Sequence, residues 1–284
     1  MKATTFSKLL LIAAITFSLA SCKKDKTDNL EEIETTFEIS ENQTTSENID
    51  QDAVDVTEES AARNGLVGLS NICGSPTFPN WIGTCATVTV TGNFPAKNIK
   101  IDFGTGCTSP NGKVRKGIIN ILLTDSLYKP GSVATITFDN YFVNLFKREG
   151  TIVRTNTTVV GSGIRSHNRT VTNGRVTAPD GRVWTHSSNL NITQIAGVLT
   201  PCNFLDDVHT IEGTRTATNA QGKTRTATTQ TALQKKADCP HFDQGILKIQ
   251  GVNHYAIIDF GNGFCDNQAT ISIDGRPTRT ITLR

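Results

Sequence analysis

The chain has 284 residues and a formal net charge of +2, and its length suits one large all-β domain or two small ones. Its seven cysteines are many for a protein of the reducing cytosol and usual for an exported one. The near-neutral total hides an uneven distribution of charge. Residues 22–64 contain 13 acidic and four basic residues, whereas residues 65–284 contain 13 acidic and 22 Lys or Arg.

The N-terminal residues predict an export signal. A short basic start precedes an apolar run over residues 9–19, which is too short to span a bilayer as a helix. The following Leu19-Ala20-Ser21-Cys22 resembles the lipobox of bacterial lipoproteins, in which the signal is cut before the Cys and the new N-terminus is acylated. The alternative is an ordinary secretory signal with an unrelated Cys at its end. We expect residues 1–21 to be a lipoprotein signal peptide and Cys22 to carry lipid.

Residues 22–64 predict an acidic, disordered tether. They are rich in Asp, Glu, Thr, Ser, Asn and Gln and contain few apolar residues, a composition typical of segments that cannot bury a core. As a random coil, residues 23–60 would span roughly 35 Å. Such a tether would lift a basic body off the membrane. We interpret the charge split as the solubility of two unlike segments rather than as the mark of a specific partner.

An internal repeat predicts two related hairpins in the body of the protein. The segment NIKIDFGTGC over residues 98–107 recurs as YAIIDFGNGFC over residues 255–265, and an alternating strand precedes each copy. The Asp-Phe-Gly triplets resemble the magnesium-binding triplet of protein kinases, but no glycine-rich nucleotide loop or catalytic-loop motif accompanies them. We interpret them as strand ends before Gly-x-Gly turns, in which Asp102 and Asp259 accept turn amides.

Six cysteines remain if Cys22 is lipidated, and six cysteines allow fifteen connectivities. Hairpins over residues 85–107 and 239–265 would bring the cysteines at their ends opposite one another, within reach of a disulfide. A structural zinc site is the alternative, but no two cysteines have the close Cys-x-x-Cys spacing. The sequence therefore predicts the pairs Cys85–Cys107 and Cys239–Cys265, which leaves Cys73–Cys202 as the third.

The middle of the chain predicts antiparallel strands. Residues 133–233 alternate with a period near two and are rich in Thr and Val. Turn dipeptides predict tight hairpins at Asn111-Gly112, Asn173-Gly174, Asp180-Gly181, Gln221-Gly222 and Asp274-Gly275. Neither face of residues 213–231 is strongly apolar, so we expect these strands to add little to a core, and to project or to form an open sheet wetted on at least one side.

These patterns together predict the fold class. No segment of the mature chain shows a convincing helical period, apart from a turn or two near residues 61–72. The expected fold is therefore all-β, with antiparallel hairpins or a meander that form an open sheet or a sandwich over residues 65–284. Disulfides staple this domain, and the disordered tether precedes it.

The densest polar cluster, residues 203–209, contains the candidates for a chemical site. On a strand, Asp206 and Asp207 would point to opposite faces, whereas Asp207 and His209 would share one. An enzyme would use the two carboxylates as acid and base, or Asp207 and His209 as metal ligands. The other interpretation is a loop that ends in a strand, with an Asp capping the turn. Because no nucleophile elbow, zinc-binding helix or phosphate loop is present, we expect no catalytic residue, metal or cofactor.

Several segments resemble a known family. The Ser-Cys-Lys-Lys-Asp start at residue 21 and the acidic segment resemble lipoproteins of Bacteroidota. From Cys85 onward, the motifs IDFGTGC, FDNYFVN, FLDDV, IDFGNGFC and TITL resemble a family of envelope lipoproteins of that phylum to which no activity is assigned. The resemblance implies β structure and an envelope location, and it carries over no functional residue. Lys23 after the lipidated Cys resembles sorting to the outer membrane, on its periplasmic or its surface side.

Two functions are compatible with these residues. The first is a non-enzymatic envelope module, anchored in the membrane through Cys22, that binds a partner protein or an anionic glycan through a wide β surface. Its basis is the Lys and Arg residues on alternating strands, which could share one face, although solvated sheet faces explain them as well. Nucleic acid is not an expected partner, since few aromatic residues lie between these bases.

The alternative function is a hydrolase of envelope or environmental polymers. It would use the carboxylates near residues 206–209 together with Asp139 or Asp259. A third function, carriage of lipid, would need an apolar trough, and we expect the Thr-rich middle of the chain to be too polar to line one.

Overall fold

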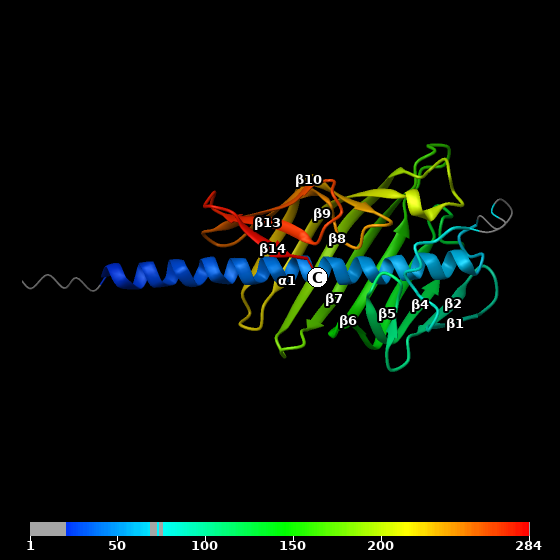
Figure 1. Cartoon of the computed structure of the whole chain (residues 1–284), viewed down its shortest axis with the longest axis horizontal. Coiled ribbons are helices and arrows are strands. Elements are labelled where there is room, and N and C mark those ends of the chain that lie inside the picture. Colours follow the sequence, from blue (N-terminus) through cyan, green and yellow to red (C-terminus); the bar gives the residue numbers. More distant parts are fainter. Residues whose placement is uncertain (1–20, 69–72, 74–75, 284) are drawn as a thin grey trace, which may run out of the picture.

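The described residues, 21–68, 73 and 76–283 in the computed structural model, form one long helix and an antiparallel sheet of 14 strands (Figure 1). The helix α1 spans Ser21–Arg63. The strands are β1 (Thr87–Thr91), β2 (Lys97–Asp102), β3 (Cys107–Thr108), β4 (Val114–Leu123), β5 (Val133–Val143), β6 (Phe146–Asn156), β7 (Ser166–Thr177), β8 (Val183–Ala196), β9 (Val208–Thr218), β10 (Thr224–Lys236), β11 (Gln244–Gln250), β12 (Tyr255–Asn262), β13 (Gln268–Ile273) and β14 (Arg279–Thr282).

The sheet is a meander in which almost every strand pairs with its neighbours in the chain. Its order runs from β1 to β14, and only the short β3 lies off this path, paired with β4. The two edges, β1 and β14, stay apart, so the sheet is open. This architecture confirms the predicted fold class, antiparallel β-strands that form a meander in an open sheet.

The helix α1 occupies the segment for which the sequence predicts a disordered tether, and over the helical residues that prediction is wrong. Most side chains from Asn42 to Ala62 are buried, although many of them are polar. Hydroxyl groups are satisfied within the helix; for example, Ser40 and Thr57 donate to the carbonyl oxygens four residues earlier. Because the sheet encloses a polar helix, no apolar stripe marks α1, and the hydrophobic pattern gave no helical signal.

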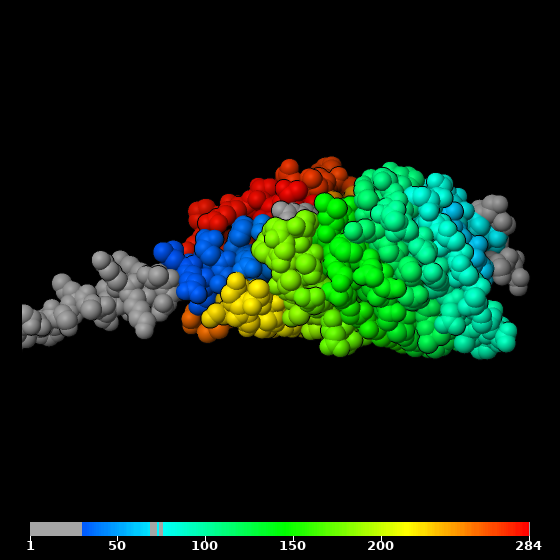
Figure 2. All heavy atoms as spheres, turned by 90° about the horizontal axis from the view of Figure 1, so that it is seen from below, coloured from blue at the N-terminus to red at the C-terminus, as the bar shows by residue number. Residues whose placement is uncertain are grey.

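Figure 1 shows α1 crossing the strands, with β13 and β14 on one side of it and the early strands on the other. In the view of Figure 2, the first turns of α1 after residue 30 lie at the surface at one end of the molecule, and the strands cover the helix farther along. Two apolar clusters hold it there. Ile33 packs in the cluster of the C-terminal strands, whereas Ile49 and Val54 pack in the cluster of β2, β4 and β5.

The two repeated segments form the predicted turns and disulfides. Oδ1 of Asp102 accepts the amide of Gly104 at 2.9 Å, and Oδ1 of Asp259 accepts the amide of Gly261 at the same distance. The structure contains the three predicted pairs, Cys73–Cys202, Cys85–Cys107 and Cys239–Cys265, with Cα–Cα distances of 5.4, 5.5 and 5.6 Å. The first hairpin pairs Thr87 with Asp102, so the cysteines are joined just beyond its paired residues rather than across them.

Two local predictions need correction. Asn173-Gly174 lies inside β7 as a bulge rather than at a hairpin turn, opposite Gly150 of β6. A Cβ at Gly150 would lie 2.3 Å from the carbonyl oxygen of Asn173, so the bulge needs a glycine there. The polar strands of residues 213–231 contribute to the interior, because their inner face is covered by α1 and carries Arg215, Ala217, Arg225 and Ala227.

Candidate functional site

The inner face of the sheet is lined with arginine side chains that point toward α1. Alternate residues of a strand share one face, so arginines at inner positions face the helix. Five that bond to α1 are at most 4% exposed and come from five strands: Arg115 of β4, Arg148 of β6, Arg169 of β7, Arg215 of β9 and Arg225 of β10. Arg154 of β6 is also buried, and it donates to the Leu127 carbonyl instead. The sequence offered two interpretations for these bases, a solvated face or a surface for an anionic polymer, and neither describes these five residues.

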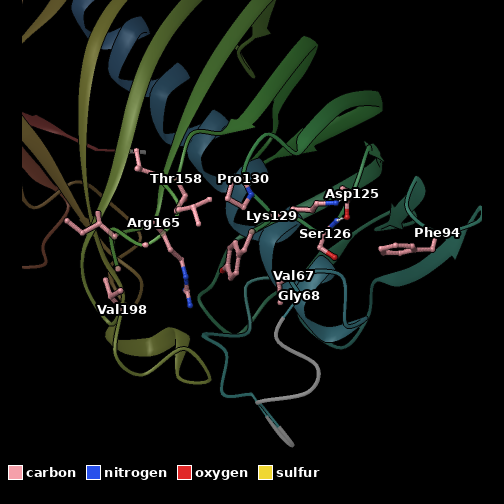
Figure 3. A pocket seen from close by; sticks show the side chains of 16 residues that line it. Val67, Gly68, Phe94, Asp125, Ser126, Lys129, Pro130, Thr158, Arg165 and Val198 are labelled. Carbon is pink, nitrogen blue, oxygen red and sulfur yellow. Dashed lines mark hydrogen bonds and ion pairs between the residues drawn. The ribbon is translucent and has the colours of Figure 1, made fainter.

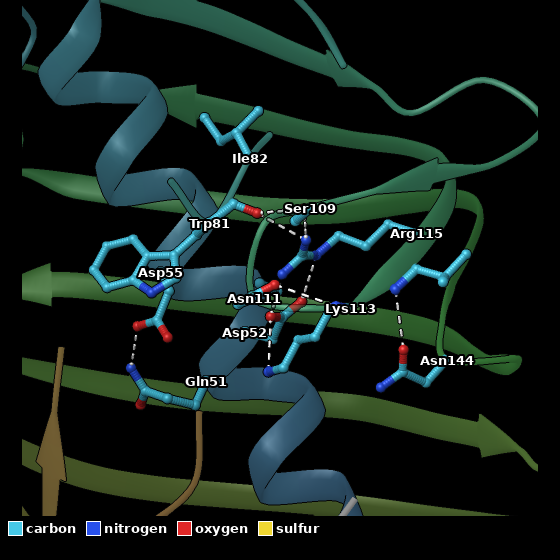
Figure 4. Close-up of polar contacts among 12 residues, drawn as sticks. Gln51, Asp52, Asp55, Trp81, Ile82, Ser109, Asn111, Lys113, Arg115 and Asn144 are labelled. Atoms are coloured by element: carbon cyan, nitrogen blue, oxygen red, sulfur yellow. Dashed lines mark hydrogen bonds and ion pairs between the residues drawn. The ribbon is translucent and has the colours of Figure 1, made fainter. Parts of the chain in front are cut away.

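Asp52 of α1 is held by Arg115 of β4 and by Lys113 of the turn that precedes β4 (Figure 4). Its carboxylate accepts from Nε and Nη2 of Arg115 at 2.8 and 2.5 Å and from Nζ of Lys113 at 2.9 Å. A two-pronged contact of this kind is among the strongest that a carboxylate can make. Burial alone would raise the pKa of Asp52, but the charges of Arg115 and Lys113 hold it well below its usual value.

The same pattern continues toward the N-terminus of α1. Asp50 accepts from Nε of Arg148 at 2.6 Å and lies 2.9 Å from Nε2 of His186. Glu47 bridges Arg169 and Nε of Arg215, the latter at 2.7 Å. Burial opposes ionisation of Glu47, yet the two guanidinium groups keep its pKa below the usual value. The acidic helix is therefore the counter-charge of the basic sheet.

The candidates Asp206, Asp207 and His209 lie where the short 3-10 helix η1 (Phe204–Asp206) leads into β9. Asp206 is exposed, and its carboxylate accepts from the Thr200 hydroxyl at 2.8 Å. Asp207 is buried, and its Oδ1 accepts from Nε2 of Gln194 at 2.7 Å. Asp207 and His209 line one small cavity, so the structure brings these two together, and Asp206 is not part of its lining. Asp206 and Asp207 precede β9, so the alternation of a strand does not apply to them.

This cavity, of about 20 Å³, is also lined by residues that the sequence analysis did not select. Asp55 and Glu58 reach it from α1, and His167 and Lys235 reach it from β7 and β10. The sequence analysis missed these residues because they come together only when α1 packs inside the sheet. The composition of the α1 segment does not indicate that packing. The cavity has the volume of about one water molecule and cannot hold a substrate.

The protonation of this cluster is set mainly by burial. Burial and the neighbouring charge of Glu58 raise the pKa of Asp207 to about 7. Burial lowers the pKa of His209 to about 4, against the opposing charge of Glu58. Among the residues that the structure describes, no group of His, Cys, Asp and Glu is arranged to hold a metal ion.

The carboxylates invoked for a hydrolase are not brought together. Asp139 lies on β5 and Asp259 on β12, and both are exposed, whereas Asp207 is buried at the start of β9. The strand order separates β9 from β5 by four steps and from β12 by three. At about 4.8 Å for each step, these separations are roughly 19 and 14 Å along the sheet, more than the 5–9.5 Å of paired-carboxylate chemistry.

Asp207→Asn is expected to stabilise the protein more at pH 8 than at pH 5. The pKa of Asp207 is raised on folding, so the folded state favours the protonated carboxyl and loses stability as the pH rises from about 4 to about 7. Asn keeps an oxygen for Gln194 and has no charge to bury. Urea denaturation of both proteins at the two pH values measures the effect. An equal shift at pH 5 and pH 8 would contradict it.

An open pocket lies at the end of the molecule where α1 ends (Figure 3). We call it the distal pocket; its volume is about 640 Å³. It is formed by the segment after α1 and by the β1–β2, β4–β5, β6–β7 and β8–β9 loops. Its lining comprises Val67, Gly68, Phe94, Asp125, Ser126, Tyr128, Lys129, Pro130, Thr158, Val159, Val160, Gly161, Gly163, Ile164, Arg165 and Val198.

The walls of the distal pocket are mostly apolar and carry two basic groups. Lys129 forms an ion pair with Asp125. The guanidinium of Arg165 lies 4.5 Å from the centre of the Tyr128 ring, and the Tyr128 hydroxyl donates to Glu58 of α1. The sequence analysis did not select these residues, because they lie in separate loops. The available signal was the pair Val159-Val160 in a glycine-rich turn, where large apolar residues are unusual.

No helix among the described residues has the length and apolar character needed to cross a membrane. Comparisons of the chain with protein-family models, with curated proteins and with solved structures found no match.

Proposed function

We propose that the protein is an envelope lipoprotein, anchored in the outer membrane through Cys22, that binds a partner protein at the distal pocket and catalyses no reaction. One observation carries the proposal: large apolar side chains are exposed together on the loops around that pocket. Val160 is 84% exposed and Leu199 is 96% exposed. Exposed apolar patches of this kind on soluble domains usually mark a site of protein interaction.

The patch extends over two neighbouring loops. Val159 and Ile164 belong to the β6–β7 loop, Ile195 is the last residue but one of β8, and Leu199 follows Val198 in the β8–β9 loop. Isolated exposed apolar residues are ordinary, but their concentration around one hollow is not. The charges favour a protein over an anionic glycan as the partner. The arginines of the inner face, which such a glycan would need, are already neutralised by α1.

The helix also supports a role in presentation. Residues 22–63 of α1 are about 60 Å long at 1.5 Å per residue, and the distal pocket includes Val67 and Gly68 just after the end of the helix. A lipid on Cys22 and the distal pocket would therefore lie at opposite ends of α1. The β-sheet domain would stay at a fixed distance from the membrane, whereas a flexible tether of the same residues would allow that distance to vary.

Replacing Val160 and Leu199 by Asp is expected to abolish partner binding without loss of stability, since both side chains are exposed. The partner is first identified in cells by a photo-crosslinking residue at position 160 or 199. Position 252 is the matched control, because Val252 is 81% exposed and lies outside the patch, between β11 and β12. The purified partner is then titrated with the wild type, with V160D/L199D and with V252D.

The proposal requires one protein that crosslinks from positions 160 and 199 but not from 252, and that loses affinity only for V160D/L199D. Equal crosslinking from all three positions, or equal affinity of all three proteins, would overturn it. Turnover of an envelope polymer by the wild type that disappears in Asp207→Asn would instead support the hydrolase.

A further inference from the structure

We infer that the distal pocket takes an acidic, branched-aliphatic segment of the partner, whose carboxylate is bound by the guanidinium of Arg165. The inference rests on the proposed function and adds to it the chemistry of the segment that is recognised. It is argued from the charge of Arg165, from the apolar walls around it and from the way the arginine is held.

Arg165 forms no ion pair among the described residues, unlike the five arginines of the inner face that bond to α1. Among the described residues, its guanidinium makes one hydrogen bond, which is long, with Nη1 3.4 Å from Oε1 of Gln194. A guanidinium at the edge of an apolar hollow binds a carboxylate through parallel N–H donors, and this geometry is specific for a planar anion.

The charge of the pocket fits one carboxylate rather than a polyanion. Lys129, the other basic residue of the lining, is already paired with Asp125. Among the residues that the structure describes, Arg165 is then the one basic residue of the lining that forms no ion pair. A nucleic acid or a highly charged glycan would need several free cations, which this lining does not supply.

The walls around Arg165 determine the rest of the ligand. Val159, Val160, Ile164 and Val198 line the same pocket. Figure 3 shows Arg165 and Val198 on one side of the hollow and Asp125 and Lys129 on another. The volume of about 640 Å³ lies within the range of sites that accept a compact ligand or a few side chains. Branched aliphatic side chains beside an Asp or Glu would fill these walls and reach the guanidinium.

Arg165 is also held in place before a ligand arrives. Its guanidinium stacks on Tyr128, and the Tyr128 hydroxyl is fixed by Glu58 of the buried helix. A side chain that is already ordered loses less conformational entropy on binding, which increases affinity. Lysine cannot reproduce both the stacking and the two-pronged contact, so Arg165→Lys should not restore full binding.

The test uses a phage-displayed library of random 12-residue peptides, selected on the purified full-length protein. We expect enrichment of peptides with Asp or Glu between Leu, Ile or Val. Synthetic versions should bind Arg165→Gln about tenfold more weakly or worse, as for the loss of one charge-assisted hydrogen bond. Arg175→Gln is the matched control: it removes the same charge from an exposed arginine of β7 that pairs with Glu149.

A second measurement identifies the contact itself. Replacing the peptide's carboxylate by an amide should weaken binding to the wild type as much as Arg165→Gln does. In Arg165→Gln, the same replacement should lower the affinity little further, because the carboxylate of the peptide and the guanidinium of Arg165 interact with each other in the wild type.

The outcomes separate the inference from the proposed function. Peptides without acidic residues, or equal binding to the wild type and Arg165→Gln, would overturn the inference. If these peptides still fail to bind V160D/L199D, the docking surface of the proposed function stands. If no peptide prefers the wild type to V160D/L199D, both are wrong.

Discussion

Glu47→Gln is expected to lower the free energy of unfolding by about 3–5 kcal/mol, the usual cost of removing one partner from a buried ion pair. Glu47 is the counter-charge of both Arg169 and Arg215, and all three side chains are buried. The substitution preserves the shape of the side chain and leaves two guanidinium groups inside the protein without an anion. The loss therefore comes from uncompensated charge rather than from a cavity.

Urea denaturation at pH 7 measures this cost, and Glu34→Gln is the matched control because Glu34 is an exposed residue of the same helix. Glu34→Gln should lower the free energy of unfolding by less than about 1 kcal/mol, as is usual for the loss of an exposed charge. Equal costs for the two variants would show that α1 is not buried in the sheet.

The effect of Glu47→Gln should also depend on pH. The pKa of Glu47 is lowered on folding, so its contribution is complete above the unfolded value of about 4.3 and is lost as the pH falls below it. The gap between the wild type and the variant should therefore narrow below pH 4. If Glu47→Gln fails to fold at pH 7, comparison of both proteins at low pH still provides the test.

Cys22→Ser is expected to move the protein from the membrane fraction to the soluble fraction. Acyl chains contribute about 0.8 kcal/mol per buried CH₂ group, and two or more of them give stable attachment. Serine cannot accept the lipid through a thioether, so the variant loses this attachment. The free energy of unfolding of the purified protein, measured by urea denaturation, should be unchanged. The cysteines at 73, 85, 107, 202, 239 and 265 pair with one another and do not need Cys22.

Ser21→Ala is the control for this prediction, since it preserves a small residue before the cysteine and should leave the protein in the membrane fraction. Cell fractionation followed by immunodetection measures the distribution. Retention of Cys22→Ser in the membrane fraction would contradict lipid anchoring through this residue.

The strand and disulfide predictions succeeded because their signals are local or repeated. The hairpin segments alternate over a few residues, and Asp102 and Asp259 lie two residues before the amides that they accept. The repeat related two cysteine pairs, and the third pair followed from the even count. The Asn173-Gly174 dipeptide shows the limit of local reasoning, because the same two residues serve a turn or a bulge according to the length of the strand around them.

The prediction for α1 failed because disorder is inferred from the composition of a segment taken alone. Glu47 and Arg215 are 168 residues apart, yet each removes the cost of burying the other. Taken separately, the acidic segment and the basic strands have compositions typical of solvent-exposed chain, but together they form a buried interface. The opposite net charges of the two parts of the sequence are consistent with this interface, but they do not show which individual residues pair.

The candidate site divides in the same way. The sequence selected Asp207 and His209, which line one cavity, but Asp206 and Asp207 belong to the end of a 3-10 helix rather than to a strand. It could not show that Glu58 reaches that cavity from a buried helix, because that contact depends on the packing of α1. The distal pocket depends on loops that are far apart in the chain, and only the register of the strands brings these loops to one edge of the sheet.

The amino-acid sequence by itself determined the strands, the turns around the repeated Asp-Phe-Gly segments and the three cysteine pairs, because neighbouring residues or an even count fix these features. The tertiary structure alone decided that the acidic segment is a helix inside the sheet and that five inner arginines bond to it. It also placed Arg165 at an open pocket, where it forms no ion pair with the described residues. These features depend on the free energy of burying opposite charges together, and that energy is set only when distant segments meet.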